Sequence, residues 1–446
     1  MLEYTIPEIP ILLTFASFLF FINLAEGLAN YLIEAGLLGS LVVGIIYGPE
    51  AANILPTDAQ TTFQVMGYIG LLLIVFEAGL STDMSLLYKN IWLSLLVALT
   101  GVGLPIGLSI LLLSVGYKYT VFQGFAAGAA LCSTSLGTTL ALLSPEIKKT
   151  RTGVVLLSAA LIDDVVGLVI AAIISEISSV DEASVSIKWQ TIVRPIMVSV
   201  AFGLFTFIVS RLLRFLVFRL PAEWKDRLRT QRVQLFMLVF VLAGYVAGAN
   251  YSGTSELFGA YLAGTLLTHV FALSSHEECE DKIEDHQIIT PIHAFTVYII
   301  PILQVLLSPL FFASIGAALP IRSLGSVRGS HRVVWRGIIY SLLMGVAKAA
   351  VGVWMFVWPE RDGGPHILTI IQAATLGTAM VARGEIALIV AEIARPILGD
   401  DEPFAVVVWA ILLNTVGGAV GVGLVLRARM DKPSRRSSAG ALQPSR

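Results

Sequence analysis

The chain has 446 residues, of which 56% are hydrophobic and only 13% charged, and its formal net charge is −2. Soluble proteins carry about 25% charged residues, so this composition excludes a soluble globular protein and indicates an integral membrane protein. The charges form no basic stripe for nucleic acid, and the two cysteines form neither a disulfide framework nor a zinc motif.

Hydropathy along the chain predicts thirteen membrane-spanning helices, so the expected fold is an all-α integral membrane protein. The N-terminal residues MLEYTIPEIP lack the basic region and cleavage site of a signal peptide, so we expect the first apolar stretch to be retained as a helix. The second range is short, which leaves counts of twelve and fourteen open. The predicted ranges are 10–31, 37–49, 64–80, 91–115, 120–143, 152–177, 190–219, 232–250, 255–271, 297–320, 334–358, 367–395 and 404–427.

The distribution of Lys and Arg predicts the orientation. These residues concentrate in the loops 148–151 and 211–232 and in the tail from Arg427, which the positive-inside rule places in the cytoplasm. We therefore expect the N-terminus outside and the C-terminus in the cytoplasm, with four arginines after the tenth span as an exception. The host membrane, plasma or organelle, stays open. The basic, Ser-rich residues 431–446 are typical of a disordered cytoplasmic tail.

An odd number of spans suggests two six-helix halves of inverted orientation, joined by a linker helix at about 190–219. Two spans in matching positions contain features that interrupt helices. The fifth holds glycines and the polar run that starts at Cys132, and the twelfth holds Gly377-TAMVARGE. Non-helical backbone at membrane depth is tolerated only where it lines a cavity, so these spans are predicted to be discontinuous and to form the binding site.

Asp163 and Asp164 are adjacent in the middle of the sixth predicted span. One charged Asp near a helix centre costs roughly 2.5–3.5 kcal/mol, so a pair requires water, a counter-ion or a proton. Two neighbouring carboxylates also resist being ionised together, so one proton or one cation satisfies them. The pair therefore predicts a cation-transport site. The alternative is a polar patch that packing neutralises.

Lys348 is the only charged residue between Ile338 and Trp358, and we expect it to face a carboxylate inside the bundle. The alternative is a lysine in a water-filled crevice without a role in transport. Ser133 and Thr134, at the interruption of the fifth span, offer oxygens suited to a hard cation. Such hydroxyls also commonly bond their own backbone.

Six motifs resemble the monovalent cation/proton antiporters, in particular the sodium/proton antiporters and potassium-efflux antiporters of the cation/proton antiporter-2 type. They occur in family order between about residues 60 and 400. They are Phe76-EAGLSTD, Cys132-STSLGTTLALL, Ala160-LIDDVVGLV, Ser308-PLFFASIGAAL, Gly345-VAKAAVG and Ala382-RGEIALIVAEI.

The resemblance implies an inverted-repeat sodium/proton antiporter fold with two discontinuous crossing helices. It also implies roles for the site residues. Asp164 is expected to be the principal ligand of the transported Na⁺, and Asp163, the second acid of that site, to be the partner of Lys348. Arg383 and Glu385 are expected to form a structural ion pair at the interruption of the twelfth span. Glu77 is a further candidate partner for Arg383.

The resemblance further implies a transmembrane domain over 1–430 that acts as a homodimer in the lipid bilayer. Its core part, at about 91–177 and 334–427, would slide past a dimerisation part at about 10–80 and 232–320, with 190–219 as the linker. No cofactor is expected beyond the transported Na⁺ and H⁺, and no catalytic residue is expected.

The paired aspartates with a lysine are the family pattern of electrogenic exchange, so we expect Na⁺, with Li⁺ as a candidate, to exchange for protons by an elevator-like movement. Potassium/proton exchange and sodium-coupled symport of an organic anion remain alternatives. A membrane sensor that transports nothing is the alternative of another class. No nucleophile–base pair, phosphate-binding loop or metal cluster indicates an enzyme.

Overall fold

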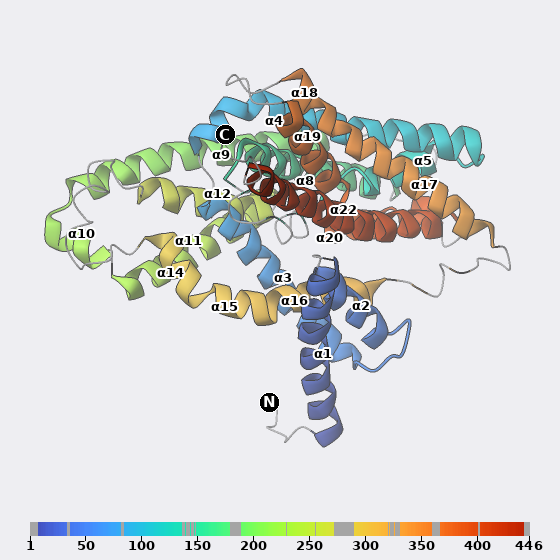
Figure 1. Ribbon diagram of the computed structural model, residues 1–446, viewed down its shortest axis with the longest axis horizontal. Coiled ribbons are helices and arrows are strands. Elements are labelled where there is room, and N and C mark those ends of the chain that lie inside the picture. The colour runs from blue at the N-terminus through green and yellow to red at the C-terminus, as the bar shows by residue number, and fades with distance from the viewer. Residues whose placement is uncertain are drawn as a thin grey trace, which may run out of the picture.

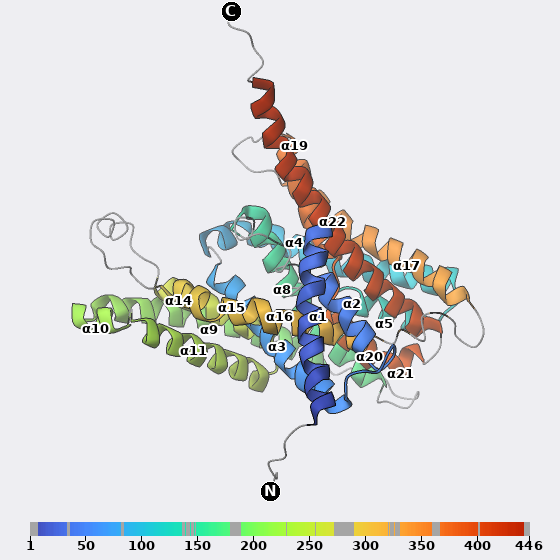
Figure 2. The same ribbon diagram turned by 60° about the horizontal axis from the view of Figure 1, so that its bottom comes forward.

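The computed structural model describes residues 8–33, 36–81, 84–135, 139, 143, 147, 149–178, 189–228, 230–254, 256–271, 290–319, 321, 325, 331–358, 366–399 and 402–440. Every regular element in these ranges is a helix, which confirms the predicted all-α class. Figures 1 and 2 show the arrangement from two directions.

The first half of the chain begins with three helices and a long fourth helix that ends in a π-helical turn. A capping box between Thr120 and Gln123 then starts α5, because the two side chains satisfy each other's backbone N–H groups. The elements are α1 (Ile9–Ile33), α2 (Leu37–Tyr47), α3 (Thr57–Leu80), α4 (Met84–Ser109), η1 (Ile110–Gly116), α5 (Val121–Ala130) and α8 (Arg151–Ser178).

The middle of the chain begins with the helix at the predicted linker and contains the helices between Trp189 and Ala318. Gly253, with φ of 83°, ends α11 in the left-handed conformation that glycine adopts readily. The elements are α9 (Trp189–Arg219), α10 (Ala222–Leu228), α11 (Gln231–Ser252), α12 (Glu256–Val270), α14 (Pro291–Tyr298), α15 (Ile300–Ile302), η2 (Leu303–Leu307) and α16 (Ser308–Ala318).

The last part of the chain contains the second interrupted helix pair and the longest helix. The elements are α17 (Arg332–Ala349), η4 (Ala350–Val353), α18 (Trp354–Val357), α19 (His366–Val381), α20 (Glu385–Ile393), α21 (Arg395–Leu398) and α22 (Glu402–Gly440). α22 extends into the segment 431–446 that we predicted to be disordered, so residues 431–440 are helical instead. A helix that already exists can be extended without a new nucleation step. The composition of the tail does not show that a helix precedes it and continues into it.

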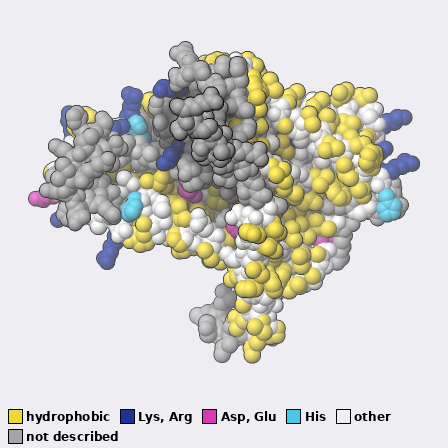
Figure 3. Space-filling view, in the orientation of Figure 1, with side chains coloured by type: hydrophobic (Ala, Val, Ile, Leu, Met, Phe, Trp, Pro, Cys, Tyr) yellow, Lys and Arg dark blue, Asp and Glu magenta, His cyan; other side chains and the backbone are white. Residues whose placement is uncertain are grey.

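Eight of the described helical stretches are long and apolar enough to cross a bilayer, and three shorter apolar helices accompany them. This supports a multi-pass integral membrane protein. Each of the thirteen predicted ranges contains helical residues, although the number of complete crossings stays a prediction. Figure 3 shows hydrophobic side chains over much of the described part of one face, with several Lys and Arg at its left and right margins, as expected for a surface that contacts lipid.

The described helices pack in two groups. In one, α2 and α16 lie together, α3 packs against both α16 and α12, and α11 packs on α12. In the other, α4 packs on α8 and α5, while α17 packs on α22 and α19. α9 contacts α12 and α8, so it joins the groups. The grouping follows the ranges given above for the dimerisation and core parts, whose separate roles stay predictions.

Two helices of the first group approach each other at glycines. A Cβ atom on Gly44 of α2 would collide with the carbonyl oxygen of Ala313 in α16, and one on Gly316 of α16 would collide with that of Leu41. The contact is reciprocal, because each helix places a glycine against the backbone of the other. Small residues allow such close packing in membranes, where the hydrophobic effect does not drive helices together.

Candidate functional site

Non-helical residues lie at both predicted interruptions, and the two stretches contact each other, although crossing helices stay a prediction. α5 ends at Ala130, and α19 ends four residues before α20 begins at Glu385. The backbone N–H of Ser135, after α5, donates a 3.0 Å hydrogen bond to the carbonyl oxygen of Ala382, between α19 and α20. A Cβ atom on Gly384 would collide with the Ser135 side chain, so the close approach requires glycine there.

Beside this meeting point lies a fully buried ion pair. Lys348 Nζ, from α17, is 2.6 Å from Asp163 Oδ2, from α8, and both side chains have 0% exposure. Thr134, in the non-helical residues after α5, donates from Oγ1 to Asp163 Oδ2 at 2.9 Å. The same Oγ1 accepts a 2.9 Å hydrogen bond from Lys348 Nζ. The predicted residues Asp163, Lys348 and Thr134 therefore form one closed triangle of hydrogen bonds.

A buried ion pair is tolerated only when its geometry is good and further hydrogen bonds satisfy the charged groups. Oδ2 of Asp163 meets this condition, because it accepts hydrogen bonds from both Lys348 and Thr134. Its other oxygen, Oδ1, is buried and has no hydrogen-bond partner among the described residues. The carboxylate thus keeps a free acceptor that a metal ion or a proton can use.

Asp164 is the next residue of α8, and its side chain lies outside the described residues. The predicted role of Asp164 as principal ligand stays a prediction.

Arg383 supplies a second buried cation at the interruption between α19 and α20. Its side chain has 0% exposure, and its Nη1 donates a 2.6 Å hydrogen bond to the carbonyl oxygen of Ser133. Its own carbonyl oxygen accepts from Thr415 Oγ1 at 3.0 Å, which ties the interruption to α22. Ser133, predicted as a cation ligand, is thus placed beside the ion pair with its carbonyl oxygen engaged by Arg383.

We predicted two acidic partners for Arg383, Glu385 and Glu77, and the structure describes the side chain of only the second. The Glu385 side chain lies outside the described residues, although its backbone begins α20. Glu77 lies half-buried in α3, and the contacts of Arg383 that the structure describes do not include it. Both pairings stay predictions. Nε and Nη2 of Arg383 have no hydrogen-bond partner among the described residues.

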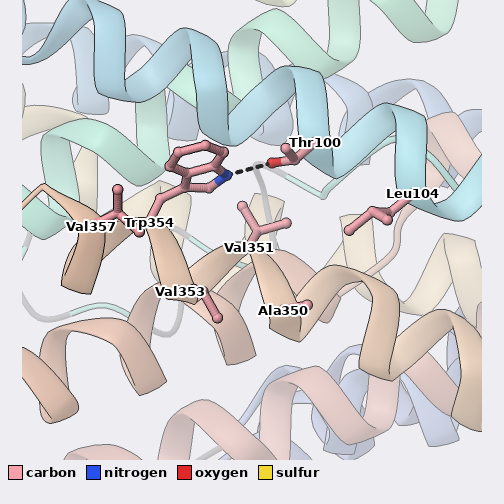
Figure 4. Close-up of a pocket in the computed structure, with 7 residues that line it drawn as sticks. All are labelled: Thr100, Leu104, Ala350, Val351, Val353, Trp354 and Val357. Carbon is pink, nitrogen blue, oxygen red and sulfur yellow. Dashed lines mark hydrogen bonds between the residues drawn. The ribbon is translucent and has the colours of Figure 1, made fainter.

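A groove of about 300 Å³ lies between α4 and the helices η4 and α18 (Figure 4). Trp354 Nε1 donates a 3.0 Å hydrogen bond to Thr100 Oγ1 across it. The lining carries no charged group, so the groove does not suit a dehydrated cation. Its residues are Thr100, Leu104, Ala350, Val351, Val353, Trp354 and Val357.

Sequence reasoning missed two polar clusters at opposite ends of this helix group. At one end, the buried Arg151 donates to Asn90 Oδ1 at 2.8 Å and to the carbonyl oxygen of Trp358 at 2.7 Å. Arg151 was counted only as a loop charge. Its position at the first residue of an apolar helix was the signal that could have identified it.

At the other end, Arg336 pairs with Glu402 at 2.9 Å and lies 4.9 Å above the ring of Tyr117. Arg336 is one of the four arginines that depart from the predicted orientation, and Glu402 is its carboxylate partner. Arg336 also donates to the hydroxyl of Tyr119 at 3.4 Å. Burial, as the largest cause, raises the pKa of Tyr119 to about 12.

Comparison with known proteins identifies the family of the chain. Residues 7–428 match the family described as sodium/hydrogen exchanger, transmembrane. The probable Na(+)/H(+) antiporter GerT of Bacillus cereus is 27% identical, over 83% of this chain and 86% of GerT. The high-affinity Na(+)/H(+) antiporter NhaS3 of Synechocystis sp. is 25% identical, over 84% of this chain and 76% of NhaS3. The Na(+)/H(+)-K(+) antiporter GerN of Bacillus cereus is 25% identical, over 88% of this chain and 91% of GerN.

The fold is similar to that of the sodium proton antiporter MjNhaP1 from Methanocaldococcus jannaschii. The TM-score is 0.59 at 16% identity, over 94% of this chain and 98% of MjNhaP1. This similarity concerns the fold and confirms the predicted antiporter-type architecture. Because the family match extends over the membrane helices that hold the Asp163–Lys348 pair, the chain belongs to the sodium/hydrogen exchanger transmembrane family.

Proposed function

We propose that this protein is a secondary active antiporter that exchanges Na⁺ for protons across a membrane. The observation that carries the proposal is the completely buried pair of Asp163 and Lys348 beside two interrupted helices. A carboxylate in that position needs a positive partner in every state. Lysine, sodium and proton are three such partners, and competition among them is the basis of exchange.

In the proposed cycle, Lys348 pairs with Asp163 when neither a cation nor a proton occupies that carboxylate. A sodium ion that binds Asp164 and the free Oδ1 of Asp163 displaces the ammonium group. Protons then displace sodium on the other side of the membrane. Exchange results because a carboxylate cannot hold a proton and a cation at once, and a single site open to one side at a time couples the two flows.

The charge balance of this cycle supports electrogenic exchange. If both aspartates take up a proton when sodium leaves, two protons cross the membrane in one direction for each sodium ion that crosses in the other, so each cycle moves one net positive charge. The presence of Lys348 in contact with Asp163 supports this stoichiometry, because the lysine gives Asp163 a partner that changes during the cycle.

We further propose an elevator-like movement of the group containing α4, α8, α17 and α22 against the group containing α2, α3, α12 and α16. The separate packing of the two groups supports this division. α1 exposes large apolar side chains along most of its length, which supports a homodimer contact or a lipid contact at that helix. The N-terminus outside and the C-terminus in the cytoplasm complete the proposal.

Potassium/proton exchange is the second candidate function. It is favoured by the similarity to GerN, whose description names both sodium and potassium. The carboxylate and hydroxyl oxygens at the site are compatible with either ion, because both are hard monovalent cations.

Transient currents on solid-supported membranes test the proposal. The purified protein in liposomes is given steps of NaCl, LiCl or KCl over a series of pH values, with choline chloride as the control. Sodium-dependent currents whose size varies with pH support sodium/proton antiport. Currents with potassium alone support the second candidate. Currents that require an organic anion indicate symport, and the lack of any cation-dependent current at every pH indicates a sensor.

A further inference from the structure

Gly101 of α4 forms a wall of the buried ion pair. A Cβ atom on Gly101 would lie 3.2 Å from Lys348 Nζ and 3.7 Å from Asp163 Oδ2. A contact of 3.2 Å is tighter than the usual carbon contact distance, so an alanine there would push the ammonium group aside. The Lys348 ammonium group therefore packs directly against the backbone of Gly101, which has no side chain to exclude it.

The carbonyl oxygen of Gly101 is available as a hydrogen-bond acceptor. Pro105 lies four residues after Gly101 inside the same helix. A proline has no N–H, so the carbonyl oxygen of Gly101 does not receive the hydrogen bond that the fourth following residue normally donates. At membrane depth a carbonyl oxygen without a donor is costly, so another group is expected to supply one.

The ammonium group of Lys348 is a suitable donor. It has three N–H bonds, and two of them are directed to Asp163 Oδ2 and Thr134 Oγ1. Among the described residues the third N–H bond has no acceptor, and it lies beside Gly101, whose carbonyl oxygen lacks the N–H that Pro105 cannot donate. When Lys348 gives up Asp163, a buried ammonium group needs a new acceptor, because an unpaired buried charge is very unfavourable.

We propose that Gly101 is a positioning residue for Lys348, and that its carbonyl oxygen accepts the ammonium group when a cation or a proton takes the place of the lysine at Asp163. The inference rests on the proposed function, because it concerns the lysine in the cation-loaded state. Gly101 supplies the space for the movement, and Pro105 keeps the acceptor free. Both residues stabilise the loaded state without touching the transported ion.

Two substitutions test the two parts separately. Gly101→Ala closes the approach to the carbonyl oxygen. Pro105→Ala leaves the approach open but restores an N–H that occupies this oxygen. Gly103→Ala and Gly107→Ala are matched controls, because both glycines lie in α4 and an added Cβ atom meets nothing within 4 Å. All three glycine variants gain the same helix propensity.

We expect Gly101→Ala and Pro105→Ala each to raise the sodium concentration for half-maximal exchange by roughly tenfold, as the loss of one charge-assisted hydrogen bond predicts. The controls should match wild type. In a Lys348→Gln background the first two substitutions should cause no further shift. A role in helix packing alone would produce the same shift with or without the lysine.

The inference is overturned if both variants match the controls, if Gly101→Ala alone shifts the half-maximal concentration, or if the shifts persist without Lys348. Sodium-induced stabilisation against heat, measured in detergent, gives the same comparison without transport. Wild-type protein that binds sodium but does not exchange it refutes the antiport proposal and leaves the test of Gly101 intact. Wild-type protein that does not respond to sodium at any pH overturns both.

Discussion

Thr134 bridges the ion pair from the side, because its single hydroxyl group donates to Asp163 Oδ2 and accepts from Lys348 Nζ, each at 2.9 Å. The bridge places residues of three separate segments in one network. Thr134, Asp163 and Lys348 can each be substituted separately, and each substitution removes a different hydrogen-bond or charge partner from the other two residues.

Asp163→Asn should lower the stability of the folded protein. The amide cannot balance the charge of Lys348, and breaking a buried pair by removing one partner costs about 3–5 kcal/mol. The melting temperature in detergent measures the loss, with Asp58→Asn at an exposed carboxylate as the control. Adding Lys348→Gln should recover part of the loss. Equal melting temperatures for Asp163→Asn and Asp58→Asn would contradict the importance of the pair.

Asp164→Asn should abolish pH-driven sodium uptake by proteoliposomes, because the amide can neither bind sodium as an anion nor carry a proton. The protein should still fold, as judged by its elution as a single species in size-exclusion chromatography. Sodium uptake at the wild-type rate would show that Asp164 is not the principal ligand.

Lys348→Gln should reduce the charge moved per cycle more than it reduces sodium binding. The glutamine removes the positive partner that alternates with sodium and proton at Asp163, but it leaves both carboxylates in place. Peak current and half-maximal sodium concentration, measured on the same membranes, separate the two effects. An unchanged current would refute the proposed exchange of partners.

Thr134→Val should raise the half-maximal sodium concentration by roughly tenfold, because we expect the Thr134 hydroxyl to bind the cation in the loaded state, and the loss of one hydrogen bond to a buried charge costs about 1–3 kcal/mol. Thr134→Ser keeps the hydroxyl and should behave as wild type. Thr375→Val is the matched control, because that buried hydroxyl bonds only to the carbonyl oxygen of Ile371 in its own helix among the described contacts. A similar shift in both valine variants would assign the effect to general packing.

Tyr119 should make the protein less stable at high pH. Its pKa is raised from 10.0 to about 12 in the folded state, mainly by burial. Its contribution to stability is therefore complete below pH 10 and decreases as the pH rises from 10 towards 12. Melting temperatures of wild type and Tyr119→Phe, compared between pH 9 and 12, isolate this contribution. Parallel curves for the two proteins would disprove it.

Much of the site could be predicted from the sequence because charged residues in apolar segments are costly. Asp163 and Lys348 stand out in stretches where lipid-facing positions allow no charge, and each therefore had to find the other inside the bundle. Their contact in the structure agrees with that expectation. The all-helical fold follows for a related reason, since a backbone in lipid must satisfy its own hydrogen bonds.

The sequence could not indicate contacts that depend on how distant segments approach each other. The carbonyl oxygen of Ser133 meets Arg383 although 250 residues separate them, and backbone oxygens carry no signal in a sequence. Gly101 is one of 39 glycines, and the proline four residues after it has no visible importance until the structure places Gly101 next to Lys348. The helical residues 431–440 differ from expectation because composition does not show where a preceding helix ends.

The reciprocal glycine contact between α2 and α16 has a practical consequence for experiments on motion. Gly44 and Gly316 bring the backbones of α2 and α16 into direct contact, so the two helices cannot slide past each other without a collision. They therefore provide a fixed reference for distance measurements. Spectroscopic labels on the exposed residues Ile46 of α2 and Ala318 of α16 should keep a constant separation during turnover, whereas a label on the exposed Val353 of η4, which follows α17, tests the proposed displacement relative to that fixed frame.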